Sequence, residues 1–334
     1  MILFSCGWIK RESLECINMD ISCPVCTSES VNTDLILSDD RYGYSKQFNI
    51  QKCTSCNHQF ISSNFEYEFI TWLYSKYYPR SQMSVDDYKP SPSHTGFVSW
   101  FNGENRSPYC YVPENVTVLD IGCGFGETLG YHTKRGCDVY GVEADQNIKR
   151  VADKYGFKVK VGLFDTNDYP AEFFHYITMD QVLEHMVDPV DTLKGISRIL
   201  KPNGQVIISI PNPEGWGIKV FGKKWINWHI PYHIHHFSQK SIEIAADKAG
   251  LYIENVRTVT SSEWLFYQWV HLFTTPIMGK PSVFWCQKVK RNIRDKIIMY
   301  IITAIHFTKI NHIITRIFDL MGMGDSKLYF IRKE

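Results

Sequence analysis

The chain has 334 residues, 44% of them hydrophobic, so it is long enough for one large domain with a smaller one beside it. Its 36 Lys and Arg residues balance 35 Asp and Glu residues, which argues against a broad nucleic-acid-binding surface. The apolar run at the start, MILF, is too short for a secretory signal, so we expect a reduced, cytoplasmic setting. Residues 1–19 are expected to be a tail.

Two cysteine pairs mark the first predicted module, residues 20–62. Cys23 and Cys26 form one Cys-x-x-Cys pair, and Cys53 and Cys56 form the other, with short predicted strands between them. Four thiolates at this spacing are typical of a tetrahedral Zn²⁺ site. The metal supplies folding energy that a segment of about 40 residues cannot obtain from its own core. The sequence therefore predicts a zinc ribbon with structural zinc.

An aromatic-rich bridge follows over residues 63–115. Its first part has helical spacing, whereas residues 89–93 (KPSPS) contain two prolines that break any helix. Such a segment either crosses over a cofactor cleft or packs as a strap between domains, and the sequence leaves both alternatives open.

Residues 116–258 are predicted to form an α/β core, because apolar strand patterns alternate with helical ones. The first strand runs into Gly122, Gly124 and Gly126, and the second ends in Glu143. This order describes the first β-α-β unit of a nucleotide-binding fold, in which glycines let the backbone approach a ligand. A carboxylate at the tip of the second strand can accept hydrogen bonds from both ribose hydroxyls.

The glycine loop resembles the first motif of class I S-adenosylmethionine (SAM)-dependent methyltransferases, whose form is hydrophobic–Asp–hydrophobic–Gly-x-Gly-x-Gly. Three more segments are similar to the sugar- and quinone-type branch of that family: residues 181–185 (QVLEH), 200–205 (LKPNGQ) and 231–238 (PYHIHHFS). A cysteine-pair module ahead of such a core is similar to enzymes of bacterial surface-glycan and deoxysugar pathways. The resemblance implies a Rossmann-like, mostly parallel sheet with one antiparallel strand.

The resemblance also implies a set of SAM-binding residues. The loop glycines approach the cofactor, Asp120 orients the loop and receives the ammonium group, and Glu143 binds the ribose. Asp165 is a candidate for the adenine amino group, with backbone groups near Leu163 as the alternative. The whole predicted cofactor-binding set is Asp120, Gly122, Gly124, Gly126, Glu143, Asp165, Asp180 and Gln181.

Histidines are the candidates for the catalytic base. A hydroxyl acceptor has a high pKa, so a nearby imidazole helps to remove its proton. We assign this role to His185, His233 and His236, with packing or lining of the acceptor pocket as the alternative for each. His233 and His236 are three residues apart and would share a face on a turn of helix. A metal site from this group, which includes His235, is a further alternative.

Residues 259–334 are predicted to be a helical or lid segment, with a final strand that completes the sheet as an antiparallel hairpin. The apolar stretch 297–305 is too short to span a bilayer. With the basic residues before it, the segment 288–305 would fit a membrane surface. A dimer helix or a substrate lid is the alternative that the sequence favours.

The predicted function is SAM-dependent O-methylation of a sugar or glycan-linked acceptor in polysaccharide biosynthesis. Known C-methyltransferases of the deoxysugar group are longer, which favours O-methylation here. A lipid- or quinone-like acceptor and a non-catalytic SAM-binding scaffold are the alternatives. A nucleic-acid acceptor is excluded by the charge balance and because no Pro-Pro-Tyr follows the fourth strand. We expect a cytoplasmic protein, either free or peripheral at the inner membrane face, and leave a homodimer open.

Overall fold

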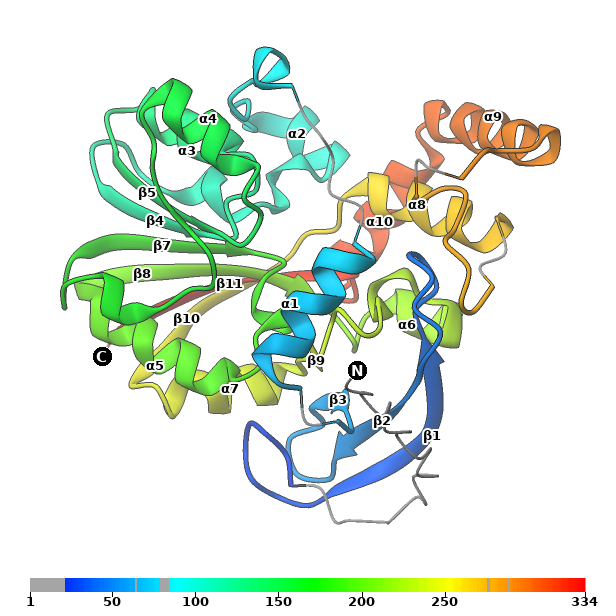
Figure 1. Cartoon of the computed structure of the whole chain (residues 1–334), viewed down its shortest axis with the longest axis horizontal. Helices are drawn as coiled ribbons and strands as arrows, with labels where there is room; N and C mark the ends of the chain where they lie inside the picture. The colour runs from blue at the N-terminus through cyan, green and yellow to red at the C-terminus, as the bar shows by residue number, and fades with distance from the viewer. Residues whose placement is uncertain (1–21, 64, 79–83, 275–276, 287–288, 334) are drawn as a thin grey trace, which may run out of the picture.

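The computed structural model describes residues 22–333 apart from 64, 79–83, 275–276 and 287–288. The predicted tail, residues 1–19, and Lys288 of the predicted membrane-contact segment lie outside the described residues. The described strands form two sheets, a four-stranded one in the order β1-β2-β3-β9 and a seven-stranded one in the order β10-β11-β8-β7-β4-β5-β6 (Figure 1).

The seven-stranded sheet is mostly parallel, as the sequence predicts. Its parallel strands are β4 (Thr117–Ile121), β5 (Asp138–Glu143), β6 (Lys158–Val161), β7 (Phe174–Asp180) and β8 (Leu200–Pro211). Strand β11 (Ser326–Lys333) runs antiparallel between β8 and β10 (Leu251–Thr258). The predicted final antiparallel strand is confirmed, whereas the hairpin is wrong, because β11 is inserted inside the sheet and its partner β10 lies three helices earlier in the chain.

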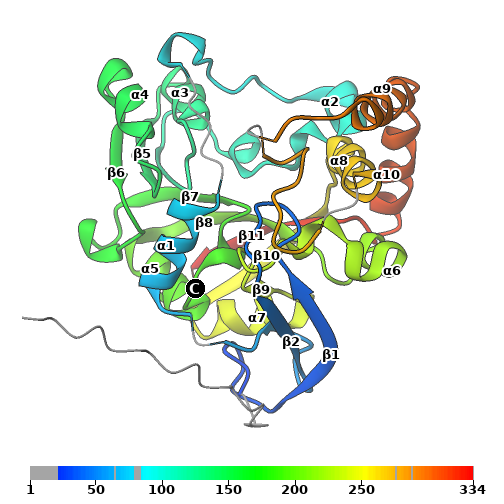
Figure 2. The ribbon, with the colours of Figure 1, turned by 45° about the vertical axis from the view of Figure 1, so that its right-hand side comes forward.

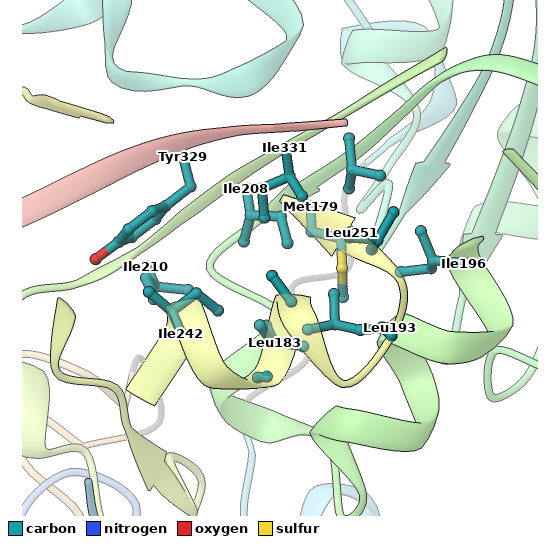
Figure 3. Close-up of a cluster of buried hydrophobic side chains, with 14 of the residues drawn as sticks. Met179, Leu183, Leu193, Ile196, Ile208, Ile210, Ile242, Leu251, Tyr329 and Ile331 are labelled. Carbon is teal, nitrogen blue, oxygen red and sulfur yellow. The ribbon is translucent and has the colours of Figure 1, made fainter. Parts of the chain in front are cut away.

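Helices cover both faces of this sheet, since its central strands are buried on both sides. The helices are α3 (Glu127–Thr133) and α4 (Ile148–Tyr155) on one face, and α5 (Pro189–Ile199) and α7 (Gln239–Asp247) on the other. Figure 3 shows Leu193 of α5 and Ile242 of α7 beside Ile208 of the sheet. Helix α5 ends at Ile199, and Asn203 and Gly204 already lie within β8.

The N-terminal module (residues 22–63) is not separate from the core. Its strands are β1 (Ser30–Ser38), β2 (Gln47–Cys53) and β3 (Gln59–Ile61), and β3 pairs with β9 (His235–His236). The helical turn suggested for His233 and His236 is therefore wrong, because β9 is extended and completes the sheet of the N-terminal module. The Lys248 ammonium and the Ser238 hydroxyl of the core also donate to the backbone carbonyls of Val25 and Cys56.

The bridge packs against the glycine loop as a strap. It comprises α1 (Tyr67–Lys76), α2 (Gly96–Asn102) and the 3₁₀ turns η1 (Val85–Asp87), η2 (Glu104–Arg106) and η3 (Pro108–Tyr111). The Tyr88 hydroxyl donates to the Gly126 carbonyl at 2.8 Å, and the Ser91 N–H donates to the Glu127 carbonyl at 2.8 Å. The strap therefore holds the turn at which α3 begins.

Apart from α7, the α-helices that follow β8 lie on the side of the molecule away from β6 (Figure 2). Short turns within the core are η4 (Thr166–Asp168) and η5 (Leu183–His185), followed later by α6 (Trp216–Phe221), η6 (Gly222–Lys224) and η7 (Ile226–Trp228). The last three helices are α8 (Ser262–Phe273), α9 (Ile293–Phe307) and α10 (Ile310–Leu320). In the described chain no single helix has the length and apolarity of a membrane span; α9 and α10 meet these criteria together but bend by 61° where they meet.

Ser238 provides a test of the contact between the core and the N-terminal module. Its side chain accepts from the Ser241 N–H at 3.0 Å as the N-cap of α7, and its hydroxyl donates to the Cys56 carbonyl. We predict that Ser238→Ala lowers the free energy of unfolding by about 1–3 kcal/mol, because both bonds are buried. Chemical denaturation measures the loss, and Ser261→Ala, which removes the N-cap of α8, is the control with the smaller expected effect. Equal losses in the two variants would contradict a role for Ser238 beyond capping.

Candidate functional site

The glycine loop joins β4 to α3 at the carboxyl edge of the sheet. Gly122, Gly124 and Gly126 have φ values of 77°, 57° and 83°, in the left-handed region that favours glycine. A Cβ on Gly122 would lie 2.5 Å from the Val182 side chain, whereas a Cβ on Gly124 would meet nothing closer than 3.9 Å. The loop is thus packed behind Gly122 and open in front of Gly124, which leaves space for a ligand against the backbone.

Glu143 stands at the tip of β5, beside this open loop. One carboxylate oxygen accepts from the Gly124 N–H at 3.0 Å, and the other accepts from the Asp145 N–H at 2.8 Å. Burial raises the pKa of this carboxyl group, and the backbone hydrogen bonds partly offset the rise. The two N–H groups therefore fix the orientation of the carboxylate at the edge of the loop.

Asp120 is buried at the end of β4 and ties three elements together. Its carboxylate accepts hydrogen bonds from the hydroxyls of Thr128 on α3 and Thr178 on β7, the latter at 2.7 Å. Burial raises its pKa to about 6, and these two hydrogen bonds limit the rise. The geometry places Asp120 under the loop, where its contacts with the chain hold β4, α3 and β7 in register.

The other predicted cofactor residues have contacts of their own. The Asp165 side chain caps η4 by accepting from the Asn167 N–H at 2.9 Å. Gln181 has a φ of 57° and donates from its side-chain amide to the Ser209 hydroxyl at 3.1 Å. Asp180, at the tip of β7, forms an ion pair with Arg106 at 3.1 Å. Sequence reasoning missed Arg106, because it lies in the bridge far from any recognisable motif.

Glu184, His185 and His233 form a cluster in which Glu184 and His233 are buried and His185 is partly buried. A ligand atom from each side chain lies within 4.8 Å of those from the other two. The rings of His185 and His233 are 4.6 Å apart, and the two carboxylate oxygens of Glu184 have no hydrogen-bond partner among the described residues. One carboxylate and two imidazoles at these distances can exchange a proton and also have the donor set of a divalent metal site.

The hydrogen bonds of this cluster fix which imidazole nitrogen carries hydrogen. Nδ1 of His185 lies 2.9 Å from the Tyr232 carbonyl, and Nδ1 of His233 lies 2.8 Å from the Asn227 carbonyl. A carbonyl only accepts, so Nδ1 is the donor in each neutral ring and Nε2 holds the lone pair. Burial lowers the pKa of His185 to about 4 and lowers that of His233, so both rings are neutral at neutral pH.

Burial has the opposite effect on the neighbouring acid. It raises the pKa of Glu184 to about 8, so this carboxyl group is largely protonated at neutral pH.

Tyrosines that sequence reasoning did not select enclose the cluster. The Tyr74 hydroxyl lies 2.9 Å from Nδ1 of His185. Burial raises the pKa of Tyr74, and the neighbouring Tyr78 and Tyr42 add to the rise. Its ring packs edge-on against Tyr232, and further rings complete the enclosure: Tyr42, Tyr78 and His229. The helical spacing of α1 was the one sequence signal for Tyr74.

His236 is set apart from this cluster. It lies in β9, its Nε2 contacts the Trp228 carbonyl at 3.2 Å, and its ring is 6.2 Å from that of His233. The adjacent His235 faces the N-terminal module, where its Nδ1 lies 3.0 Å from Nε2 of His58. The structure thus brings together two of the three predicted catalytic histidines and places the third in the strand that joins the module to the core.

The four module cysteines converge, as the Cys-x-x-Cys pairs predict. The sulfur atoms all lie within 4.8 Å of one another, with distances of 3.7 Å between Cys23 and Cys56 and 3.3 Å between Cys26 and Cys53. Tetrahedral zinc with bonds of about 2.3 Å separates its sulfur ligands by about 3.8 Å. These sulfur atoms are too far apart for disulfides, whose bond is about 2.05 Å. The residues present therefore fit a Cys₄ metal site.

Comparison with known proteins agrees with the resemblance of the glycine loop to that of methyltransferases. A family model described as a methyltransferase domain matches residues 97–256. A ubiquinone biosynthesis O-methyltransferase from Xanthomonas axonopodis pv. citri (strain 306) is 28% identical over 46% of this chain and 69% of its own length. Its counterpart from Pseudomonas paraeruginosa (strain DSM 24068 / PA7) is 29% identical over 43% of this chain and 68% of its own length.

Among solved structures, that of a putative sarcosine dimethylglycine methyltransferase from Galdieria sulphuraria is 15% identical, with a TM-score of 0.44 over 70% of this chain and 84% of that one. The family match covers the glycine loop, Glu143 and the Glu184–His185 pair. Residues 97–256 therefore form a class I SAM-dependent methyltransferase domain, and the protein is a SAM-dependent methyltransferase.

Proposed function

We propose that this enzyme transfers the methyl group of SAM to a hydroxyl group on a quinone-like ring. The observation that carries the proposal is the Tyr74–His185 pair, which lies beside Glu184 and among further aromatic rings. A ring of aromatic side chains around a basic nitrogen suits a flat aromatic acceptor. The similar enzymes named above are ubiquinone O-methyltransferases, which supports this acceptor class over the sugar acceptor that the sequence favoured.

A sugar or glycan-linked acceptor is the second candidate. It is favoured by the cysteine module, whose strand β3 pairs with β9 directly beside the histidine cluster. A hydroxyl group on either acceptor would need the same proton removal, so the two candidates differ in what the aromatic rings would contact.

For the cofactor, the glycine loop and Glu143 provide a binding site whose groups are already held in place. SAM, when bound, provides a methyl group activated by a sulfonium. We assign the ribose hydroxyls to Glu143 and the close backbone approach to Gly124. We assign the methionine end to the edge where Asp180 and Arg106 pair, because a carboxylate and a guanidinium match an ammonium and a carboxylate. Asp120 acts on this end through the loop that it holds, and Asp165 or the backbone near Leu163 remains our assignment for adenine.

Glu143→Ala tests the ribose assignment. We predict at least about tenfold weaker SAM binding, because two hydrogen bonds to a charged acceptor would be lost. Calorimetric titration with SAM measures the change. Glu254→Ala, which removes a carboxylate from β10 at the far edge of the sheet, is the matched control and should bind SAM like the unmodified protein. Unchanged affinity in Glu143→Ala would reject the assignment.

For the acceptor, we assign the proton to Nε2 of His185. Nδ1 is held as a donor by the Tyr232 carbonyl, so the ring keeps its orientation when Nε2 gains a proton. The buried imidazolium is costly by itself, as the lowered pKa shows. Methyl transfer would remove the positive charge of the sulfonium while the proton moves from the acceptor hydroxyl to His185, so the total charge of the site would not change and Glu184, with a pKa of about 8, would keep its proton. His233 lies beside both residues, with its Nε2 3.9 Å from a carboxylate oxygen of Glu184. We assign Glu184 and His233 as positioning residues around His185.

His185→Asn tests this role. Asparagine can still donate to the Tyr232 carbonyl but offers no basic nitrogen, so we predict a kcat lower by about 10²–10⁴-fold with unchanged SAM affinity. His175→Asn, at the opposite end of β7, is the matched control. A kcat equal to that of the control would remove His185 from the chemistry.

The assay uses a dihydroxylated aromatic acid and, separately, a nucleotide sugar as acceptors. Methylation of the nucleotide sugar alone would move the proposal to the sugar acceptor. Tight SAM binding with neither acceptor methylated would favour a non-catalytic scaffold.

We also propose that Cys23, Cys26, Cys53 and Cys56 hold structural zinc in a reduced, cytoplasmic setting. Because the module shares β9 with the core, metal binding stabilises both. We predict that Cys23→Ser releases zinc and lowers the melting temperature, measured by elemental analysis and calorimetry. Cys286→Ser, outside the module, is the control. Full zinc content and an unchanged melting curve in Cys23→Ser would refute the site.

A further inference from the structure

Helix α10 packs with its polar side inward and its apolar side outward. The residues that it buries are Asn311, His312, Thr315 and Arg316. The residues on its opposite face are Ile310, Ile313, Ile317 and Leu320, and they are exposed by 47%, 49%, 51% and 75%. A helix at a water-facing surface normally shows the reverse pattern. The composition of the exposed face of α10 is therefore that of a surface that contacts apolar groups.

The buried polar side of α10 is bonded to its neighbours through Asn311 and Arg316, so the helix cannot simply rotate. Asn311 accepts from the Trp269 indole N–H at 3.1 Å. Arg316 donates to the Trp100 carbonyl at 2.6 Å and pairs with Asp319 at 2.8 Å. These bonds connect α10 to the bridge and to α8, and turning the helix to hide its isoleucines would break them.

Helix α9 continues the same exposed apolar face. Its outward residues recur at helical spacing, with Ile293 and Tyr300 each 77% exposed. The stripe is completed by Ile297, Ile301, Ile305 and Phe307. Both views show α9 at the edge of the molecule, away from the seven-stranded sheet (Figures 1 and 2). An apolar hollow of about 260 Å³ lies between α8, α9 and α10, and is lined by Ile305 and Ile310 of the two stripes.

The exposed charged residues of α9, of the segment just before it and of the turn to α10 are basic. The exposed basic residues at the start of α9 and between the helices are Lys290, Arg291, Arg294, Lys296 and Lys309. The two acids of the segment do not balance them, since Asp295 is buried in the capping box of α9 and Asp319 is paired with Arg316. The surface that α9 and α10 offer is thus apolar with a basic rim.

We propose that α9 and α10 lie on an anionic membrane surface, with their isoleucine stripes in the lipid and their basic rim at the headgroups. Basic residues beside an apolar helical face are the pattern of interfacial helices, and anionic lipids supply the opposite charge. A second copy of the chain fits less well, because a two-fold contact would place this basic rim against itself. Both helices lie outside the region matched by the methyltransferase model, residues 97–256. The proposal does not depend on the acceptor.

The test is flotation of the full-length protein with phosphatidylcholine vesicles, with and without phosphatidylglycerol. We expect binding to the anionic vesicles, weaker binding to the neutral ones, and a decrease with added salt. The double variant Ile313→Asn, Ile317→Asn should bind at least about tenfold more weakly. Ile36→Asn is the matched control, since Ile36 on β1 is 49% exposed, as Ile313 is, and should bind like the unmodified protein.

The SAM affinity and melting temperature of the double variant show whether it remains folded. Absence of vesicle binding by the unmodified protein, or equal losses in the double variant and in Ile36→Asn, would overturn the proposal. Sedimentation velocity over a range of concentrations gives the other outcome. A dimer that the double variant abolishes, without vesicle binding, would assign the face to a second copy of the chain instead.

Discussion

The pairing of β3 with β9 is the contact on which the arrangement of the site depends. Two residues, His235 and His236, complete the sheet of the N-terminal module while the chain on either side of them belongs to the methyltransferase domain. The segment before β9 carries the Tyr232 carbonyl and His233, and both face His185. The backbone hydrogen bonds between β3 and β9 therefore position Tyr232 and His233, which lie a few residues before β9 and contact His185. The cysteine module thus helps to position the residues of the histidine cluster.

Burial gives the cluster its chemistry. The same loss of solvent that lowers the pKa of His185 raises that of Glu184, so both groups are neutral where an exposed pair would be charged. The neutral imidazole can accept the proton of an acceptor hydroxyl, while the protonated carboxyl group beside it keeps its own proton. Tyr74 and the surrounding rings cover this cluster, and they come from the bridge, from Tyr42 of the N-terminal module and from the segment before β9.

The bridge and the C-terminal helices extend the domain in two different ways. The bridge is bonded to the start of α3 through Tyr88 and Ser91, and it also supplies Arg106 to Asp180. In the described part of the chain, the C-terminal helices contribute no residue to the cluster. Helix α10 buries its polar residues against the rest of the protein and exposes its isoleucines to solvent. The bridge thus contributes residues to the site, whereas the C-terminal helices present an exposed apolar surface.

The sequence by itself determined the features that depend on local backbone needs. Three closely spaced glycines with an acid at the end of the next strand specify a β-α-β unit, because left-handed turns and strand ends are encoded within a few residues. The convergence of Cys23, Cys26, Cys53 and Cys56 followed in the same way from spacing.

Tertiary structure alone decided what depends on distant partners. Nothing near His235 or His236 indicates a strand, because β9 exists through its partner β3, more than 170 residues away. β11 takes a place inside the sheet that no local pattern encodes. The partnership of Tyr74 with His185, that of Arg106 with Asp180, and the inward polar face of α10 likewise arise from contacts across the fold. Periodicity shows that a helix has two faces, and only packing decides which one meets the solvent.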